Sequence, residues 1–265
     1  MTDSTAILSL RDVAVRFGSQ TVLDLVSVEI RRNETIAVIG ESGCGKTVLL
    51  KLIVGLLKPT SGLVEFEGHS IEGMSQYDLT TMRRRVGFLF QQAALFDSLT
   101  VFENVAFGLR TKGGVPENEI RNRVTERVKE VGLPESSLAK MPADLSGGMK
   151  KRVGLARALA LDPDVMLYDE PTTGLDPIMT DVINELILSV RKRRPVTSVI
   201  VTHEMRTVHK VADRVVMLYP RTRLAAVEPQ VIYDGPPLGM AGHSDERVRQ
   251  FVAGEAGSRV KNEDN

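Results

Sequence analysis

The chain contains four short runs of apolar residues, and polar or glycine-rich residues follow each run directly. The runs lie at residues 36–39, 86–90, 165–168 and 199–202. Runs that are apolar at nearly every position favour strands buried on both faces, and hence a parallel sheet flanked by helices. Ligands of such sheets bind beyond the carboxyl ends of the strands. The motifs that follow the four runs are therefore expected to meet around one ligand.

Other stretches have different periods. Residues 7–30 alternate apolar and polar positions, which predicts two antiparallel strands joined by a turn at residues 18–19. Residues 48–57 are apolar almost all round and predict a buried helix, while residues 120–131 and 178–194 have the spacing of amphipathic helices. The pattern predicts an α/β protein with an antiparallel β part and an inserted helical part.

Two further stretches lack a clear period. Residues 75–85 are polar and basic and end in Arg83, Arg84 and Arg85, a trio interpreted mainly as a solvated face. Beyond Tyr219 the chain is rich in proline and glycine, so we expect irregular structure there, with a last short helix near residues 245–252.

The first apolar run leads into the pattern Gly-x-x-x-x-Gly-Lys-Thr, which begins at Gly40 and is typical of a phosphate-binding loop. Side chains at Gly43 and Gly45 would hold the backbone N–H groups away from a triphosphate. Lys46 is expected to reach the outer phosphates and Thr47 to offer its hydroxyl to Mg²⁺. The helix that begins at Lys46 should point its positive end at the anion.

The predicted ATP-binding residues of this loop are Gly40, Glu41, Ser42, Gly43, Cys44, Gly45, Lys46, Thr47 and Val48. Cys44 is the single cysteine of the sequence, which leaves no internal disulfide and fits a reducing compartment. A small residue at a variable loop position explains Cys44 better than catalysis does. Its place in the loop predicts that alkylation blocks nucleotide binding and that ATP protects the thiol.

Polar side chains with suitable chemistry follow the other runs. Asp169 is placed to hold Mg²⁺ directly or through water, and Glu170 to accept a proton from water that attacks the γ-phosphate. Gln91 can bond the metal or that water, so the predicted metal ligands are Thr47, Gln91 and Asp169. His203 can contact the γ-phosphate or orient Glu170. A lone His or Gln at a strand end is usually structural, so both assignments depend on the neighbouring motifs.

Ser146, Gly147 and Gly148 form a second glycine-rich site at the start of a predicted helix. A hydroxyl, exposed N–H groups and a helix N-terminus have the composition of an anion site. Because the chain already has a phosphate loop, this second site is expected to serve the ATP of another copy in a C₂ homodimer. Nucleotide would then hold the dimer together, and hydrolysis would weaken it.

Charge and hydropathy restrict the partners. The 34 basic and 34 acidic residues cancel, which argues against a nucleic-acid surface. The first residues lack a signal segment, and no apolar run reaches the length that spans a bilayer. The chain is therefore expected to be soluble and cytosolic, with docking on a membrane protein still open.

These motifs together resemble the nucleotide-binding subunit of an ATP-binding cassette (ABC) transporter. The resemblance covers residues 7–235 and rests on residues 40–47, Gln91, Leu145–Met149, Val165–Glu170, Gly174–Asp176 and His203. It implies a P-loop ATPase with a RecA-like core, using ATP and Mg²⁺. It also implies that Asp176 addresses the opposite ATP site and that Phe17 stacks on adenine, although ordinary strand packing would equally explain Phe17.

The resemblance implies three parts of the chain. Residues 1–90 and 163–235 would form the RecA-like core with its N-terminal antiparallel β subdomain, residues 91–162 the helical signature subdomain, and residues 236–265 a C-terminal tail. Leu95, Phe96 and Phe102 are expected to grip a short helix of the permease, with packing inside the helical subdomain as the alternative.

Within the superfamily, residues 90–105, 176–178 and 245–251 are similar to ATPases of Mla/Mce-type phospholipid transporters. This implies a homodimer on the cytoplasmic face of the inner membrane, bound to transmembrane permease subunits and working with an Mce-domain protein. Residues 202–205 resemble amino-acid importer ATPases as much as they resemble the Mla/Mce type, so an amino-acid importer is one alternative. A lipoprotein-release system is a further alternative. A soluble ABC ATPase acting on nucleic acid would usually carry tandem cassettes or basic arms, and a non-hydrolysing clamp would lack Glu170.

Overall fold

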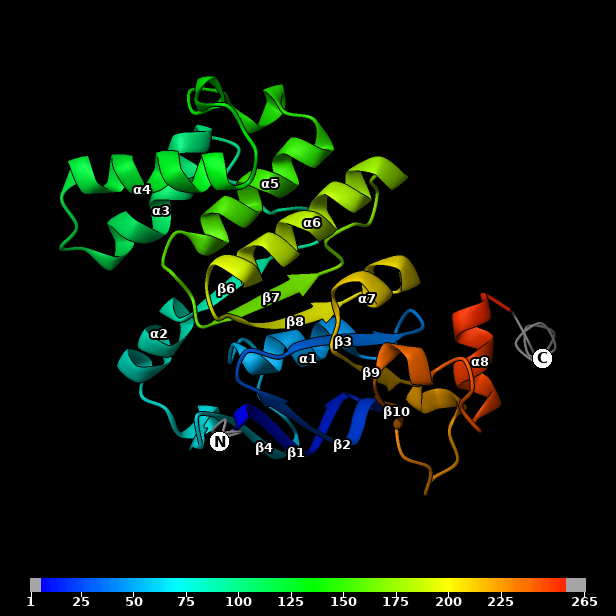
Figure 1. Ribbon diagram of the computed structural model, residues 1–265. Helices are drawn as coiled ribbons and strands as arrows, with labels where there is room; N and C mark the ends of the chain where they lie inside the picture. Colours follow the sequence, from blue (N-terminus) through cyan, green and yellow to red (C-terminus); the bar gives the residue numbers. More distant parts are fainter. Residues whose placement is uncertain (1–5, 256–265) are drawn as a thin grey trace, which may run out of the picture. The chain divides into compact units, whose positions relative to one another are not determined.

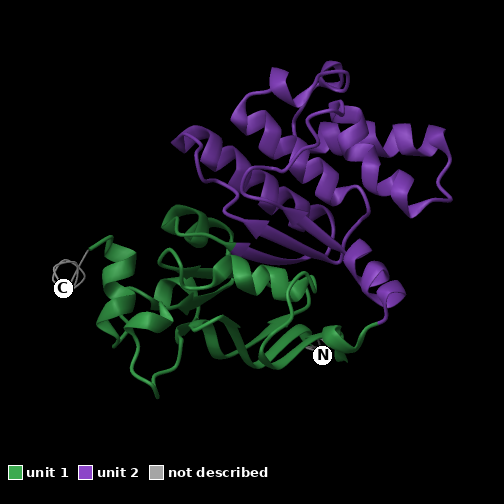
Figure 2. Ribbon diagram, turned by 180° about the vertical axis from the view of Figure 1, so that it is seen from behind, with its two compact units in different colours: residues 1–74, 201–265 green, residues 75–200 purple. Residues whose placement is uncertain are grey.

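A computed structural model of the protein describes residues 6–255. The chain forms two compact units, which Figure 2 shows in different colours: unit 1 comprises residues 1–74 and 201–265, and unit 2 comprises residues 75–200. The three-part division expected from the motifs follows other boundaries and stays a prediction. Residues 256–265 of the expected tail lie outside the described residues.

Unit 1 contains an antiparallel sheet of order β2-β1-β4-β5. Its strands are β1 (Ala6–Phe17), β2 (Gln20–Arg31), β4 (Ser61–Phe66) and β5 (His69–Ser70). Phe17 pairs with Gln20, and Gly18 in the turn between them has φ +59°. The hairpin predicted for residues 7–30 is therefore confirmed, including its turn.

Unit 1 also contains the strands of order β10-β9-β3. They are β3 (Thr35–Gly40), β9 (Arg214–Leu218), parallel to β3, and β10 (Val231–Gly235), antiparallel to β9. The helices of this unit are α1 (Lys46–Ile53), α7 (Met205–Val211) and α8 (Glu246–Ala253). Val248 of α8 is buried in one core cluster with Ile39 of β3 and Val208 of α7.

Two sequence predictions in unit 1 need correction. The helix expected over residues 48–57 ends at Ile53, because the chain turns at Gly55 with φ +63°, and the apolar residues that follow belong to that turn. The irregular structure expected after Tyr219 is interrupted by β10. This strand pairs with β9 and was hidden by the neighbouring prolines and glycines.

Unit 2 contains strands of order β8-β7-β6, namely β6 (Val86–Leu89), β7 (Val165–Asp169) and β8 (Thr197–Val201). β6 and β7 are parallel, and β7 and β8 are buried along their whole length, as the apolar runs predicted. The helices are α2 (Gln76–Arg84), α3 (Val101–Lys112), α4 (Glu117–Glu130), α5 (Gly147–Leu159) and α6 (Pro177–Arg193). Helices α3, α4 and α5 pack on one another, and in Figure 1 α6 runs along β7 and β8.

Residues 75–85, which the sequence marked only as polar and basic, contain helix α2, which the sequence pattern did not predict. Ser75 caps this helix by accepting a hydrogen bond from the Asp78 N–H group at 3.2 Å. Most of the helix is exposed, and Met82 is its buried residue. Such a narrow apolar contact leaves almost no helical period in the sequence.

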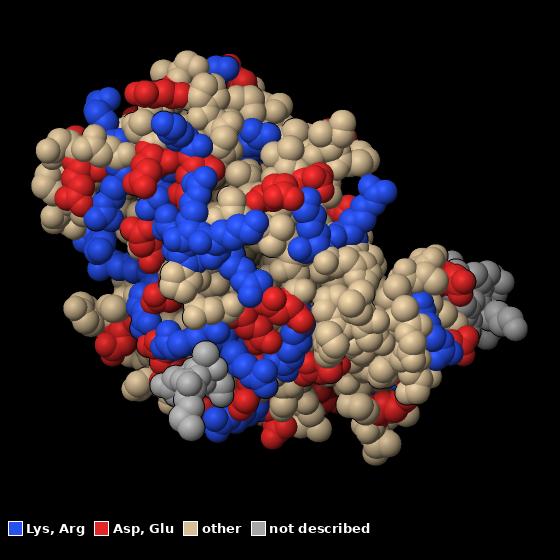
Figure 3. Space-filling view, viewed as in Figure 1, with Lys and Arg blue, Asp and Glu red and all other residues tan. Residues whose placement is uncertain are grey.

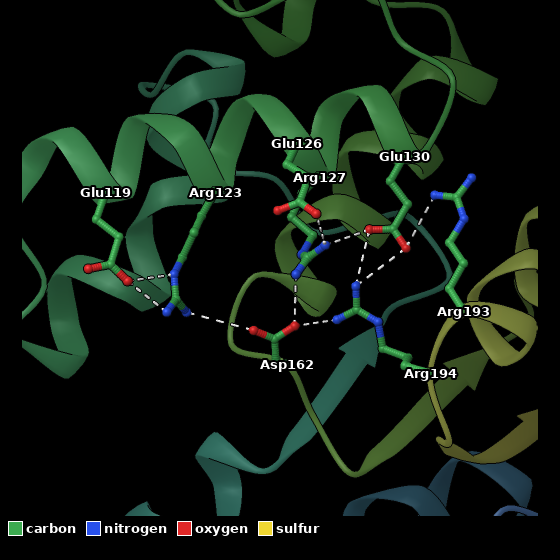
Figure 4. A network of polar contacts seen from close by, with 8 residues as sticks. All are labelled: Glu119, Arg123, Glu126, Arg127, Glu130, Asp162, Arg193 and Arg194. Atoms are coloured by element: carbon green, nitrogen blue, oxygen red, sulfur yellow. Dashed lines mark hydrogen bonds and ion pairs between the residues drawn. The ribbon is translucent and has the colours of Figure 1, made fainter.

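A network of ion pairs joins three elements of unit 2 (Figure 4). Arg127 on α4 donates to Glu130 at 2.7 Å and to Asp162, which precedes β7, at 2.8 Å. Arg194, at the end of α6, pairs with the same two carboxylates. Arg127 and Glu130 are both buried. The network therefore ties the helical layer to the strands beneath it.

On the face shown in Figure 3, acidic side chains lie interspersed among the basic ones, in keeping with the balanced charge of the sequence. Within residues 6–255, none of the helices combines the length and hydropathy of a bilayer span.

Candidate functional site

The phosphate-binding loop of unit 1 connects β3 to α1, and its glycines are required by close contacts. Gly40 has φ +145°, and a Cβ atom there would lie 2.2 Å from the Leu218 carbonyl oxygen. Gly45 has φ +100°, and a Cβ atom there would lie 2.5 Å from Leu23 Cδ2. Positive φ is costly for other residues, so both positions demand glycine. The loop is therefore packed tightly against β9 and β2.

The open side of the loop has room for an anion. Gly43 has φ +81°, and a Cβ atom built there would meet no atom within 4 Å. Gly45 is the N-cap of α1 and supplies no side-chain acceptor to the first N–H groups of the helix. These groups carry the positive end of the helix dipole. The loop thus has the chemistry of a phosphate cradle.

Lys46 is buried, and its ammonium group is held by the loop itself. The Nζ atom donates to the carbonyl oxygens of Gly40 at 2.8 Å and Glu41 at 2.9 Å, and lies 3.9 Å from Cys44 Sγ. Burial raises the pKa of the Cys44 thiol, and the charge of Lys46 opposes this shift. A protonated thiol and a fixed ammonium group therefore lie inside the loop.

Unit 1 also places His203 near the end of β3. The N–H of Thr202 donates to the Val38 carbonyl oxygen at 3.2 Å, so the residue before His203 lies beside the strand that leads into Gly40. The His203 side chain is exposed. Phe17, at the end of β1, is 50% exposed, so half of its side-chain surface is open to a ligand. Its stacking on adenine stays a prediction.

Unit 2 brings together the strand ends that carry Gln91 and the two carboxylates. Leu89 of β6 pairs with Tyr168 of β7, so Gln91 and Asp169 leave the sheet at the same edge. Asp169 is 7% exposed, while Gln91 is exposed. Strands β6 and β7 therefore end side by side, and the shared site expected for Gln91 and Asp169 stays a prediction.

Glu170 has a left-handed backbone conformation with φ +49°. Its carboxylate accepts a hydrogen bond from Thr173 Oγ1, and its carbonyl oxygen accepts one from Lys151 Nζ, each at 3.0 Å. Burial lowers the pKa of Lys151, while the charges of Glu170 and Asp169 oppose the shift. The sequence interpretation missed Lys151, although its position five residues after Ser146 in the same helix could have drawn attention to it.

The glycine-rich motif of unit 2 opens α5. The Ser146 hydroxyl accepts from the Met149 N–H group at 3.3 Å, and a Cβ atom on Gly147 would meet no atom within 4 Å. A Cβ atom on Gly148 would lie 2.6 Å from Met179 Cε. Asp176 caps α6, accepting from the Met179 N–H group at 2.9 Å. An exposed helix N-terminus therefore lies next to the start of α6.

The predicted site residues fall into two groups. Unit 1 holds residues 40–48, Phe17 and His203, and unit 2 holds Gln91, Ser146, Gly147, Gly148, Asp169, Glu170 and Asp176. Among residues 6–255, the structure contains no cluster of three His, Cys, Asp or Glu side chains that could hold a metal ion alone. The expected Mg²⁺ ligands Thr47, Gln91 and Asp169 are not a cluster of that type, since they offer one hydroxyl, one amide and one carboxylate.

Known proteins match the chain along most of its length. The family described as ABC transporter matches residues 23–173. MlaF of Haemophilus influenzae, the ATP-binding protein of an intermembrane phospholipid transport system, is 37% identical over 96% of this chain and 93% of its own. The methionine import ATP-binding protein MetN of Carboxydothermus hydrogenoformans is 44% identical over 74% of this chain and 58% of its own.

A solved structure agrees with these matches. The dimeric ATP-binding cassette MJ0796, in a post-hydrolysis state bound to ADP and Pi, is 31% identical, with a TM-score of 0.77 over 87% of this chain and 98% of that one. The P-loop α/β fold expected from the sequence is confirmed. The chain therefore belongs to the ABC transporter family, in which it is an ATP-binding subunit with ATPase activity.

Proposed function

We propose that the chain is the ATPase subunit of a phospholipid transporter of the Mla/Mce type, and that it homodimerises around two Mg-ATP to drive a membrane permease. The observation that carries the ATPase part is the open phosphate loop before α1, accompanied by Asp169 and Glu170 at the end of β7. The substrate class is supported by the likeness to MlaF along 96% of the chain.

The two groups of residues serve one hydrolysis reaction. The loop N–H groups and Lys46 bind the phosphates, and the exposed ring of Phe17 stacks on the base. Glu170 accepts the proton of the attacking water, while Gln91 and His203 orient the reactants. Thr173 fixes the Glu170 carboxylate by donating a hydrogen bond at 3.0 Å.

Mg²⁺ suits the chemistry of the residues proposed as its ligands. Thr47, Gln91 and Asp169 offer oxygen atoms, which Mg²⁺ prefers, and the small number of carboxylates suits an ion that keeps waters and substrate phosphates as ligands. When bound, the ion would neutralise charge on the β- and γ-phosphates.

A second copy of the chain completes the site. Ser146, Gly147 and Gly148 present an open helix N-terminus, and Asp176 lies at the start of the neighbouring helix. The MJ0796 cassette, which is similar over 87% of this chain, was solved as a dimer. The signature residues of one copy then bind the ATP held by the phosphate loop of the other.

An aromatic pocket in unit 2 is the proposed docking place for the permease. It has a volume of about 300 Å³ and is lined by Phe88, Phe90, Phe96 and Phe107 together with Arg84 and Arg157. Phe96 and Phe107 are 42% and 44% exposed. Phe102, expected from the sequence to take part, instead lies 5.6 Å from the Arg110 guanidinium and does not line this pocket. Docking would hold the subunit at the cytoplasmic face of the inner membrane, near an Mce-domain partner.

The test of hydrolysis uses two single variants. Glu170→Gln should bind ATP, dimerise stably and lose most turnover, because the base is gone while the binding groups remain. Lys46→Ala should lose ATP affinity. Unchanged turnover in the first variant would remove Glu170 as the base, and unchanged affinity in the second would contradict the phosphate cradle.

The test of substrate class is the identity of the co-purifying molecule. The MetN likeness makes an amino-acid importer the second candidate, although it spans only 74% of this chain. The native complex, purified with its permease, should carry phospholipid detectable by mass spectrometry. Methionine or another amino acid in its place would favour the second candidate.

A further inference from the structure

The connection between β9 and β10 lies against the phosphate-binding loop, and no motif of the sequence accounts for it. Hairpin connections usually have about 2–5 residues. Here residues 219–230 intervene, with a single helical turn at Arg221–Arg223. Tyr219 donates its backbone N–H to the carbonyl oxygen of Gln230 at 2.9 Å, so the two ends of the connection are closed against each other.

Gln230 is the last residue of this connection and is 1% exposed. Its Nε2 atom donates to the carbonyl oxygens of Val22 at 2.9 Å and Cys44 at 3.1 Å. Its Oε1 atom accepts from the Asp24 N–H group at 2.9 Å. Both amide protons and one acceptor site are therefore used. One buried side chain joins β2 to the phosphate loop.

The position of this bridge explains its effect on the loop. Gly45, next to Cys44, lies so close to β2 that a Cβ atom would come within 2.5 Å of Leu23. Strand β2 therefore packs directly against the C-terminal end of the loop. The Cys44 carbonyl group is buried and that of Val22 is partly buried, and Gln230 donates a hydrogen bond to each.

A second contact holds the beginning of the loop. Arg223 Nη1 pairs with Glu41 Oε2 at 2.5 Å, and Arg221 Nε pairs with Asp24 Oδ2 at 2.7 Å. Arg223 is 41% exposed, and exposed ion pairs contribute little. We therefore expect Gln230 to carry most of the effect and Arg223 a smaller part.

We propose that Gln230 is a positioning residue of the ATPase, which holds the phosphate-binding loop in the conformation that presents its N–H groups to the triphosphate. Gln230 acts through the Cys44 carbonyl group and does not touch the nucleotide. This inference rests on the proposed role of residues 40–47 as the ATP cradle.

Cys44 is the single cysteine of the chain and reports on this bridge. Its side chain is buried, so reaction with 5,5′-dithiobis(2-nitrobenzoate) requires the loop to open. Gln230→Leu keeps the volume and removes the three hydrogen bonds. In the absence of nucleotide it should speed labelling by about tenfold or more. Gln250→Leu on α8, whose amide donates to Glu246 at 2.7 Å on the exposed side of that helix, is the matched control and should label like the parent protein.

Steady-state ATPase kinetics give the second readout. In Gln230→Leu the KM for ATP should rise by about tenfold, because ATP must order the loop, while kcat changes by less than about twofold. A merely structural role would lower the thermal transition of the protein and the amount of active enzyme, and would leave the KM unchanged.

Labelling of Gln230→Leu at the rate of the parent protein, or an unchanged KM, overturns the proposal. If this variant does not fold, Gln230→Asn decides, since it keeps the amide but is one methylene too short to reach both carbonyl groups: faster labelling supports the proposal and an unchanged rate overturns it. The labelling is measured without nucleotide. It therefore stays informative even if Lys46→Ala shows that the loop does not bind ATP.

Discussion

The pH dependence of Cys44 alkylation tests the burial of the thiol, and protection by ATP tests its place in the phosphate-binding loop. Burial raises its pKa, so the thiol stays protonated to a higher pH than a free cysteine. The thiolate is the reactive form. We expect alkylation by iodoacetamide to be slow at neutral pH and to keep increasing above the pH at which a free cysteine peptide levels off. ATP should slow it further, and equal rates with and without ATP would count against the position of the thiol in the cradle.

Gly40 must be glycine, because the neighbouring atoms leave no room for a larger side chain. Gly40→Ala would place a methyl group 2.2 Å from the Leu218 carbonyl oxygen, at φ +145°. We expect this change to lower the free energy of unfolding by about 2–4 kcal/mol, measured by urea denaturation. Gly73→Ala is the control, because its Cβ atom would come no nearer than 3.9 Å to a neighbour, Ser70 Cβ. An equal loss in both variants would refute the explanation.

At the scale of elements, Arg157 of α5 stabilises the segment that follows Gln91. Ala93 and Ala94 have φ +60° and +46°, and Arg157 donates to both carbonyl oxygens at 2.7 Å. Left-handed backbone costs a non-glycine residue about 1 kcal/mol or more, so this conformation needs such support. Arg157→Leu should release the segment, lower ATPase turnover and speed hydrogen exchange at residues 91–96. Unchanged hydrogen exchange at residues 91–96 would indicate that this backbone conformation is stable without Arg157.

The ion-pair network between α4 and α6 makes a prediction about stability. Glu130 accepts from Arg127 at 2.7 Å, and both side chains are buried. Removing the Glu130 charge leaves the buried Arg127 with only the half-exposed Asp162 at 2.8 Å as a close partner, so the loss should be part of the roughly 3–5 kcal/mol that an uncompensated buried charge costs. Glu130→Gln should lower the urea midpoint of the protein, whereas Glu126→Gln, whose side chain is 69% exposed, should have almost no effect. Equal midpoints for the two variants would show that Asp162 alone compensates the charge of Arg127.

The sequence predicted those elements that have a strong period or fully apolar runs. β7, β8 and α6 lie within about two residues of their predicted ranges, because tertiary packing there follows the local pattern. Helix α2 and strand β10 were missed, since one buries little and the other lies among prolines. The early end of α1 depends on a left-handed Gly55, which hydrophobicity does not reveal.

At the scale of the whole molecule, motif spacing predicted the residues that carry the chemistry of the site better than the residues that hold the surrounding backbone in place. The residues with recognisable spacing, such as Lys46 and Glu170, were named from the sequence. Gln230 and Arg157 were not, because each acts on a backbone carbonyl group far away in the chain, and no local pattern records such a contact. The meeting of the two groups of site residues around one ATP is likewise a matter of tertiary structure and stays a prediction.

The aromatic pocket makes the last prediction, which concerns the complex with the permease. Phe96 lies 4.6 Å from Phe107 between ring centroids, with the Arg157 guanidinium 5.8 Å from the Phe96 ring. Phe96→Ala should weaken the co-purification of the co-expressed permease, because an aromatic anchor that is 42% exposed is lost. The basal ATPase of the isolated subunit should persist within about twofold, since the loss of one anchor leaves phosphate binding untouched. Tyr77→Ala on α2, with a side chain 79% exposed, is the matched control. Full recovery of the permease with Phe96→Ala would assign the pocket to another role.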